Sequence, residues 1–235
     1  MAGFESPVCS SCKNRVKSIF CKLQEEEALL LNTVKTCVHF KKGDTIFQEG
    51  SYPRGLYCIN TGKVKIFQIG NDGKEQIVHL ANDADVMGYR ALLGGDKYSC
   101  SAIALEDTNL CFIPKSSFIS LVEKTPKVAL QLIHLLSNEL KETEKKITNI
   151  AQYPVRDRLA LGLLTLKSNY GLEDDNATIN VIIKREDLAN IAGTTRETTI
   201  RLLYEFQEQN LIELVSKKIK ILNEAKLIEI AHTSF

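Results

Sequence analysis

The stretch that decides the fold runs from residue 185 to residue 203 and consists of Arg185-Glu186-Asp187-Leu188-Ala189-Asn190-Ile191-Ala192-Gly193-Thr194-Thr195-Arg196-Glu197-Thr198-Thr199-Ile200-Arg201-Leu202-Leu203. Ala189 is small enough to let two helices cross. Gly193 permits the left-handed backbone that a tight turn between helices requires. Thr195 can cap the second helix with its hydroxyl. The segment therefore predicts a helix-turn-helix.

The second of these helices has two chemically different faces. Its apolar and small side chains should point into the domain, at spacings of three and four: Thr199, Leu202, Leu203 and Phe206. The opposite face carries Arg196, Glu197, Ile200 and Arg201. Arginine can donate to O6 and N7 of guanine, glutamate can accept from N4 of cytosine, and an aliphatic side chain can contact the methyl group of thymine. We interpret these four residues as base-reading, although the same charges on an isolated helix would simply be solvated.

Residues around this helix can neutralise phosphate, which fixes the register on DNA without reading its sequence. A basic hairpin from Leu214 to Leu222, a wing, follows the second helix and has Lys217-Lys218 at its expected turn. The candidate phosphate contacts are Arg185, Thr195, Thr198, Lys217 and Lys218. Before the motif we expect a helix at 156–166, an acidic loop at 173–176 and a short strand at 179–183.

The first half of the chain has a different texture. From about residue 33 to residue 114, short runs rich in Val, Ile, Phe and Tyr alternate with turn residues. Examples are 44–47, 55–59 and 63–67, separated by Gly43, Gly50, Gly62 and Asp72-Gly73. This spacing predicts an antiparallel roll or barrel of short strands.

A long helix should connect the two halves. Thr125-Pro126 is a typical helix start, and no Gly or Pro follows until Pro154. A seam with steps of four and three runs along it: Ala129, Ile133, Leu136, Leu140, Thr143, Ile147 and Ile150. A second row, Val128, Leu132 and Leu135, suits packing on the roll. The seam favours a dimerisation helix in a homodimer; the alternative is a buried helix within one domain.

Bulk properties exclude several classes of protein. The chain has 235 residues and a net charge of +1, so any DNA contact must come from a local patch. It lacks a membrane-spanning apolar run and a signal-peptide layout, so we expect a cytoplasmic protein without membrane partners. The sequence contains no nucleophile–base set or phosphate-cradling glycine loop, so we do not expect an enzyme. The seven cysteines form no regular disulfide framework.

These features together resemble the superfamily of the cyclic-AMP receptor protein and the fumarate–nitrate reduction regulator (Crp/Fnr). The roll matches in 42–50 and 56–65, and the second helix is similar to the family's Arg-Glu-Thr-x-x-Arg in Arg196–Arg201. The resemblance implies an α+β fold with an N-terminal jelly-roll sensor, a long dimerisation helix and a C-terminal winged helix-turn-helix. It also implies a homodimer on a near-palindromic, TGTGA-like double-stranded DNA operator, with RNA polymerase as a further partner.

One branch of the family binds cyclic AMP through a glutamate and an arginine in the roll. Here the corresponding cassette spans Gly88–Ala102, with Tyr89 in place of the glutamate and no arginine in Tyr98-Ser99-Cys100. A buried phosphate would lack a cationic partner. We therefore do not expect cyclic nucleotide binding.

The other branch carries an oxygen-labile [4Fe–4S] cluster on four cysteines. Cys9-Ser10-Ser11-Cys12 supplies a closely spaced pair, Cys21 follows after eight residues, and Cys111 precedes Phe112-Ile113-Pro114, where the resemblance implies the fourth ligand. The predicted cluster ligands are thus Cys9, Cys12, Cys21 and Cys111. Zinc on the same four residues, or free thiols in an N-terminal arm, remain alternatives.

The predicted organisation has four parts: a cysteine-bearing arm at 1–23, a roll at 24–124, a dimerisation helix at 125–153 and a DNA-binding domain at 154–235. The predicted function is an oxygen- or redox-responsive transcription regulator. The alternative is a regulator of the same fold without a cluster, controlled by an unidentified small ligand or partner in the roll.

Overall fold

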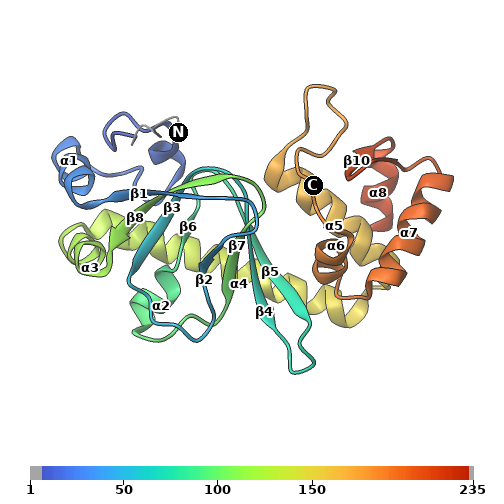
Figure 1. Cartoon of the computed structure of the whole chain (residues 1–235), viewed down its shortest axis with the longest axis horizontal. Helices are drawn as coiled ribbons and strands as arrows, with labels where there is room; N and C mark the ends of the chain where they lie inside the picture. The colour runs from blue at the N-terminus through green and yellow to red at the C-terminus, as the bar shows by residue number, and fades with distance from the viewer. Residues whose placement is uncertain (1–6, 233–235) are drawn as a thin grey trace. The chain divides into compact units, whose positions relative to one another are not determined.

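The segment of short strands forms a β-roll, as the alternation of apolar runs and turns predicts (Figure 1). The computed structural model describes residues 7–232. One four-stranded sheet has the order β1 (Thr36–Phe40), β8 (Thr108–Pro114), β3 (Gly55–Thr61) and β6 (Val86–Met87). The other has the order β2 (Thr45–Phe47), β7 (Ser101–Ala104), β4 (Val64–Ile69) and β5 (Glu75–Ala81). The ladders β1–β8, β3–β8, β2–β7 and β4–β7 are antiparallel.

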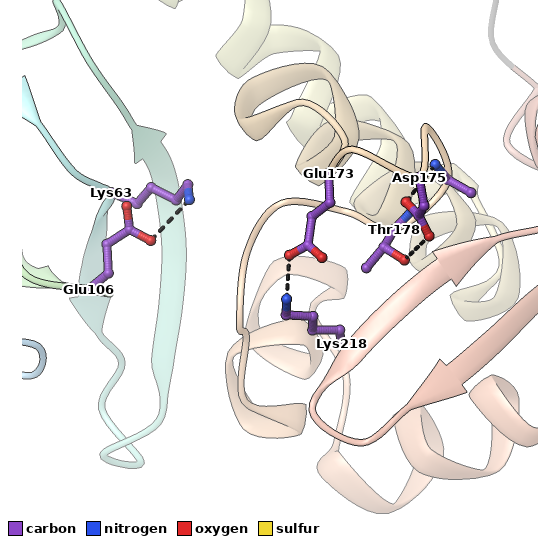
Figure 2. Close-up of polar contacts among 7 residues, drawn as sticks. Lys63, Glu106, Glu173, Asp175, Thr178 and Lys218 are labelled. Carbon is purple, nitrogen blue, oxygen red and sulfur yellow. Dashed lines mark hydrogen bonds and ion pairs between the residues drawn. The ribbon is translucent and has the colours of Figure 1, made fainter.

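The backbone at Gly62, just before β4, lies so close to Thr108 that this turn position requires glycine. Gly62 has φ +123°, and a Cβ there would lie 2.3 Å from Oγ1 of Thr108. Only glycine fits both the backbone angle and the space. Beside it, Lys63 and Glu106 form an ion pair of 2.9 Å (Figure 2). The turn before β4 is therefore held to the turn that precedes β8.

Helices and the N-terminal arm cover the outer side of the β1–β8–β3–β6 sheet. These elements are η1 (Lys13–Lys17), α1 (Glu25–Val34), α2 (Tyr89–Gly94), α3 (Lys115–Lys124) and the start of α4 (Pro126–Gln152). One apolar core joins them: Ile19, Phe20 and Leu23 of the arm pack in the same cluster as sheet residues Leu56 and Ile113 and helix residues Val128 and Leu132. The arm is thus integrated into the core that supports the first half of α4.

The C-terminal part is the predicted winged helix-turn-helix. It contains α5 (Val155–Tyr170), α6 (Arg185–Ala192), α7 (Arg196–Glu208), the hairpin β9 (Ile212–Val215) and β10 (Lys218–Ile221), and α8 (Glu224–Ile230). A Cβ on Gly162 would lie 3.1 Å from Cγ2 of Ile191, so α5 and α6 pack closely.

By its internal contacts the chain divides into two units. One extends up to Gln68 and includes His79–Lys141, and the other consists of Ile69–Val78 and the residues from Glu142 on.

The predicted strand at 179–183 is wrong. Only isolated bridges form there, from Ile179 to Leu172 and from Thr178 to Lys220. Burial still alternates as in a strand, with Ile179, Val181 and Ile183 buried. The amide of Val181, however, donates to the carbonyl of Ile179 at 2.7 Å, within its own segment. The amide of Ile179 donates to the carbonyl of Ile219 at 2.9 Å, but the turn at Val181 stops this pairing from continuing as a ladder.

No helix within residues 7–232 combines the length and the apolar character needed to cross a bilayer.

Candidate DNA-binding surface and cysteine site

The turn of the helix-turn-helix has the geometry that its sequence predicts. Gly193 ends α6 with φ +62°, in the left-handed region. Thr195 is the N-cap of α7, and its Oγ1 accepts a hydrogen bond of 3.2 Å from the amide of Thr198. Ala189 is fully buried between the helices. The glycine turn, the threonine cap and the small buried alanine together restrict the angle between α6 and α7.

The two faces of α7 also separate as predicted. Its inner face consists of Thr199, Leu202, Leu203 and Phe206, all buried. The guanidinium of Arg156 lies 5.3 Å from the centre of the Phe206 ring. Such a contact anchors the C-terminal end of the helix to α5.

The outer face is the candidate base-reading surface. Arg196, Glu197 and Arg201 are exposed, and Ile200 is half-buried between them. Arg201 forms an ion pair with Glu205, four residues on, at 2.5 Å. Sequence reasoning missed Tyr204, which is 56% exposed on the same face. Its spacing of three from Arg201 and four from Ile200 could have identified it.

The candidate phosphate contacts differ in solvent exposure and in the partners they already have. Thr195 is exposed, Thr198 is half-buried, and Lys217 is exposed at the wing turn. The Arg185 side chain is half-buried, and its Nη1 has no hydrogen-bond partner among the residues described. This donor is available to water or to a phosphate oxygen. Lys218 begins β10 instead of occupying the turn, and it pairs with Glu173.

The acidic loop is part of the wing's support, as Figure 2 shows. Glu173 pairs with Lys218 at 2.5 Å. Asp175 accepts hydrogen bonds from the amides of Ala177 and Thr178 and from the Thr178 hydroxyl. These bonds lower the pKa of Asp175 to about 2. Two acidic residues of this loop, Glu173 and Asp175, therefore have partners within the domain.

The predicted seam along α4 is largely solvent-exposed. Ile133, Leu140, Ile147 and Ile150 are each between 50% and 64% exposed. Thr143 is exposed, while Ala129 and Leu136 are half-buried. The second row behaves differently, since Val128 and Leu132 are buried in the core. The helix thus has one apolar stripe in the core and another in solvent.

The roll cavity, where the family's nucleotide cassette lies, is lined by aromatic and acidic groups. Tyr98 stacks on Phe47 with ring centres 4.2 Å apart, and Tyr89 is buried. Glu139 also lines the cavity, and its carboxylate lies 3.7 Å from Arg90. Burial and the nearby Glu139 carboxylate raise the pKa of Tyr89. The cavity therefore offers a carboxylate, and an already paired arginine, to any incoming phosphate.

Three cysteines form a row across the outer sheet. Cys111 on the central strand β8 lies directly opposite Cys37 of β1 and directly opposite Cys58 of β3. Residues in register on neighbouring strands project from the same face. The Sγ atoms of Cys37 and Cys111 are 3.7 Å apart. The thiols of Cys111 and Cys58 face the arm, since both line a cavity beneath it.

The arm brings two more thiols to this cavity. Cys9 and Cys12 line it together with Cys58 and Cys111. The amide of Cys9 donates to Oδ1 of Asn32 at 3.1 Å, and Asn14 donates to the carbonyl of Asn60 on β3. Three of the four predicted ligands are thus brought together, and Cys58 joins them. Of the residues described, Cys21 is not among those lining the cavity.

Burial dominates the electrostatics of this site. It raises the pKa of Cys9, with smaller opposing effects of Lys35 and Arg15. It raises the pKa of Cys111 to about 12, assisted by the neighbouring Cys37, and also raises the pKa of Cys58. Lys35 and Arg15 line the same cavity. Buried thiols beside two cations suit an anionic, thiolate-bound group better than a reactive free thiolate.

The spacing of the thiols bears on which group they could hold. Zinc bound by four thiolates at 2.3 Å places the sulfur atoms roughly 3.8 Å apart. Within residues 7–232, no three cysteine, histidine or carboxylate side chains converge in this way around one ion. In a [4Fe–4S] cluster each thiolate binds a different iron, so ligands distributed around a cavity are appropriate. The four cysteines that line the cavity equal the number of thiolates that such a cluster requires.

Comparisons with known proteins agree with this architecture. Residues 37–125 match the cyclic nucleotide-binding domain, and residues 157–230 match the Crp-like helix-turn-helix domain. The chain is 33% identical over 195 residues to the fumarate and nitrate reduction regulatory protein of Vibrio cholerae, covering 83% of this chain and 78% of that one. It is 29% identical to the protein of that name from Escherichia coli, covering 96% and 91%.

A solved structure shows the same fold. A transcriptional regulator of the Crp/Fnr family from Eubacterium rectale superposes with a TM-score of 0.74 at 23% identity, covering 92% of this chain and 98% of that one. The roll, the long helix and the winged helix-turn-helix define a DNA-binding transcription regulator rather than an enzyme. The chain belongs to the Crp/Fnr family.

Proposed function

We propose that this regulator responds to oxygen or redox state through an iron–sulfur cluster held between the N-terminal arm and the roll. One observation carries the proposal: Cys9 and Cys12 of the arm and Cys111 of β8 line one cavity although they are far apart in sequence. The similarity to fumarate and nitrate reduction regulatory proteins supports it. When bound, the cluster would supply a redox-labile link between the two segments.

The chain's own packing offers a route from this site to DNA. Ile19 and Phe20 of the arm share a core with Val128 and Leu132 of α4. A shift of the arm therefore changes the support of α4, the helix that leads to the DNA-binding domain. We propose that α4 pairs with its copy through the exposed stripe of Ile133, Leu140, Ile147 and Ile150, forming the homodimer.

On the operator, we propose that α7 lies in the major groove. Arg196, Glu197, Ile200 and Arg201 would read base edges, while Arg185, Thr195, Thr198 and Lys217 would contact phosphates. Lys218 would contribute after leaving Glu173. RNA polymerase remains a predicted partner, and the internal contacts of Glu173 and Asp175 leave the surface it would use unassigned.

The proposed cluster is tested by anaerobic purification followed by absorbance spectra and iron and sulfide assays, before and after air. We expect broad absorbance near 400 nm that bleaches in air, with about four iron and four sulfide per monomer. Operator binding to a TGTGA-containing duplex, measured in the same two states, should differ. A colourless, iron-free protein after reconstitution would contradict the proposal.

We further propose that the roll does not bind cyclic AMP. Glu139 lines the cavity, and Arg90 is already paired with it. A bound ligand stabilises the folded state by mass action. We therefore expect millimolar cyclic AMP to leave the melting temperature and the operator affinity unchanged, and a saturable rise in melting temperature would contradict this.

A further inference from the structure

We propose that Cys58, and not Cys21, is the fourth ligand of the cluster, so that the site consists of Cys9, Cys12, Cys58 and Cys111. This inference rests on the proposed function and assigns its ligands. It replaces a ligand expected from the arm with one from strand β3. The site would then combine two thiolates from a short loop with two from a rigid sheet.

The register of the sheet fixes the two strand ligands. Cys58 of β3 and Cys111 of β8 are direct partners in an antiparallel ladder. Their Cβ atoms should therefore lie about 5 Å apart and point the same way. Both side chains line the cavity under the arm. Two thiolates at this separation can bind two different irons of one cluster without movement of the backbone.

The arm supplies the other pair of cysteines that line the same cavity. Cys12 precedes η1 as its N-cap, and its carbonyl accepts a hydrogen bond of 3.1 Å from the amide of Arg15. Cys9 packs, like Cys58, against the core that joins arm and sheet. Both arm cysteines line the cavity together with Cys58 and Cys111.

Cys21 is kept away from the cavity by its neighbours. Ile19, Phe20 and Leu23 are each buried, at 4% to 6% exposure, and its own amide donates to the carbonyl of Ser18 at 3.1 Å. Phe20, the residue before it, lines the cavity instead. Cys21 thus lies in a segment whose neighbouring side chains belong to the core that also holds α4, which opposes its movement into the cavity.

The charge around the four thiols matches the assignment. Four thiolates on a [4Fe–4S] core leave the group with a net negative charge. Arg15 and Lys35 line the same cavity and supply the compensating positive charge. Arg15 is held in place by a hydrogen bond of 3.2 Å from its Nη1 to the carbonyl of Leu23.

The test compares single cysteine variants of the full chain, loaded with iron and sulfide under anaerobic conditions. Cys58→Ser should lose at least half of its iron and sulfide and its absorbance near 400 nm, whereas Cys21→Ser should retain both at the wild-type level. Cys37→Ser is the matched control, because Cys37 neighbours Cys111 on the other side but does not line the cavity. Loss of iron in Cys21→Ser, or its retention in Cys58→Ser, overturns the inference.

A measurement on the wild-type protein covers the case in which Cys58→Ser fails to fold. Alkylation by iodoacetamide, followed by mass spectrometry, should modify Cys21 at the same rate in the cluster-loaded and the stripped protein. Slower alkylation of Cys21 in the loaded protein overturns the inference even if no variant can be studied. Wild-type protein that takes up no cluster instead overturns the proposed function itself, so the two failures are distinguishable.

Discussion

The outer face of α7 and the cysteine cavity are opposite kinds of site. The α7 face is exposed and charged, and its geometry is fixed by a capped helix and a glycine turn. The cavity is lined by thiols, apolar side chains and two cations, and burial raises the pKa of the Cys111 thiol to about 12.

 Burial raises the pKa of the Cys58 thiol as well as that of Cys111. The exposed face of α7 is therefore ready to bind DNA, whereas the proposed cluster would have to displace thiol protons before it could bind in the cavity. A signal can therefore act more easily on a site like the cavity than on one like the α7 face.

Replacing Cys111 should produce the largest effect, because it would remove a ligand of the proposed cluster and leave the outer face of α7 intact. In Cys111→Ser we expect iron content to fall severalfold and the operator affinity to become the same with and without air. Iron assays and anaerobic gel-shift titrations measure both quantities, with Cys37→Ser as the control. A variant that still responds to air like the parent would show that the two sites are not connected through this cavity.

Charges in the seam should separate the two copies without touching either site. In the double variant Leu140→Glu, Ile147→Glu, like charges would face each other along α4, which costs several kcal/mol. We expect sedimentation to show monomers and operator affinity to fall on the order of tenfold or more. Leu130→Glu, which is equally exposed but outside the predicted seam, should remain dimeric. Dimers in the double variant would assign the stripe to another role.

Removing a base contact should lower affinity selectively. Arg201→Ala should cost about 1–3 kcal/mol of specific binding, roughly 5- to 150-fold, if Arg201 reads a guanine. Fluorescence anisotropy with the operator and with a duplex altered at that base pair provides the comparison. An equal loss on both duplexes would mean that Arg201 contacts phosphate.

The smallest effect should come from the wing. Lys217→Ala removes an exposed charge, so binding should weaken about equally on all sequences, and the slope of log affinity against log salt should fall by about 0.9. Anisotropy titrations at several salt concentrations measure the slope. An unchanged slope would remove Lys217 from the DNA-binding surface.

The two sites also differ in how far sequence could predict them. The faces of α7 follow from local periodicity, so Thr199, Leu202 and Phe206 are inside as expected. The place of Cys58 in the cavity was missed because it depends on which residue of β8 lies opposite, and strand register is a non-local property. Its place inside an apolar run, like that of Cys111, was the available signal. The strand predicted at 179–183 failed because its bonds to neighbouring segments stop after isolated bridges at its start, which local alternation of burial does not reveal.

The ion pair between Arg201 and Glu205 has a consequence for how the protein scans a genome. While paired, the guanidinium contributes little net positive charge, so its attraction to arbitrary phosphates is reduced. If Arg201 reads a base as proposed, a site would have to offer a better acceptor than the Glu205 carboxylate to repay the exchange. Wrong sites would then be left quickly, and the residence time on DNA would measure the match rather than charge alone.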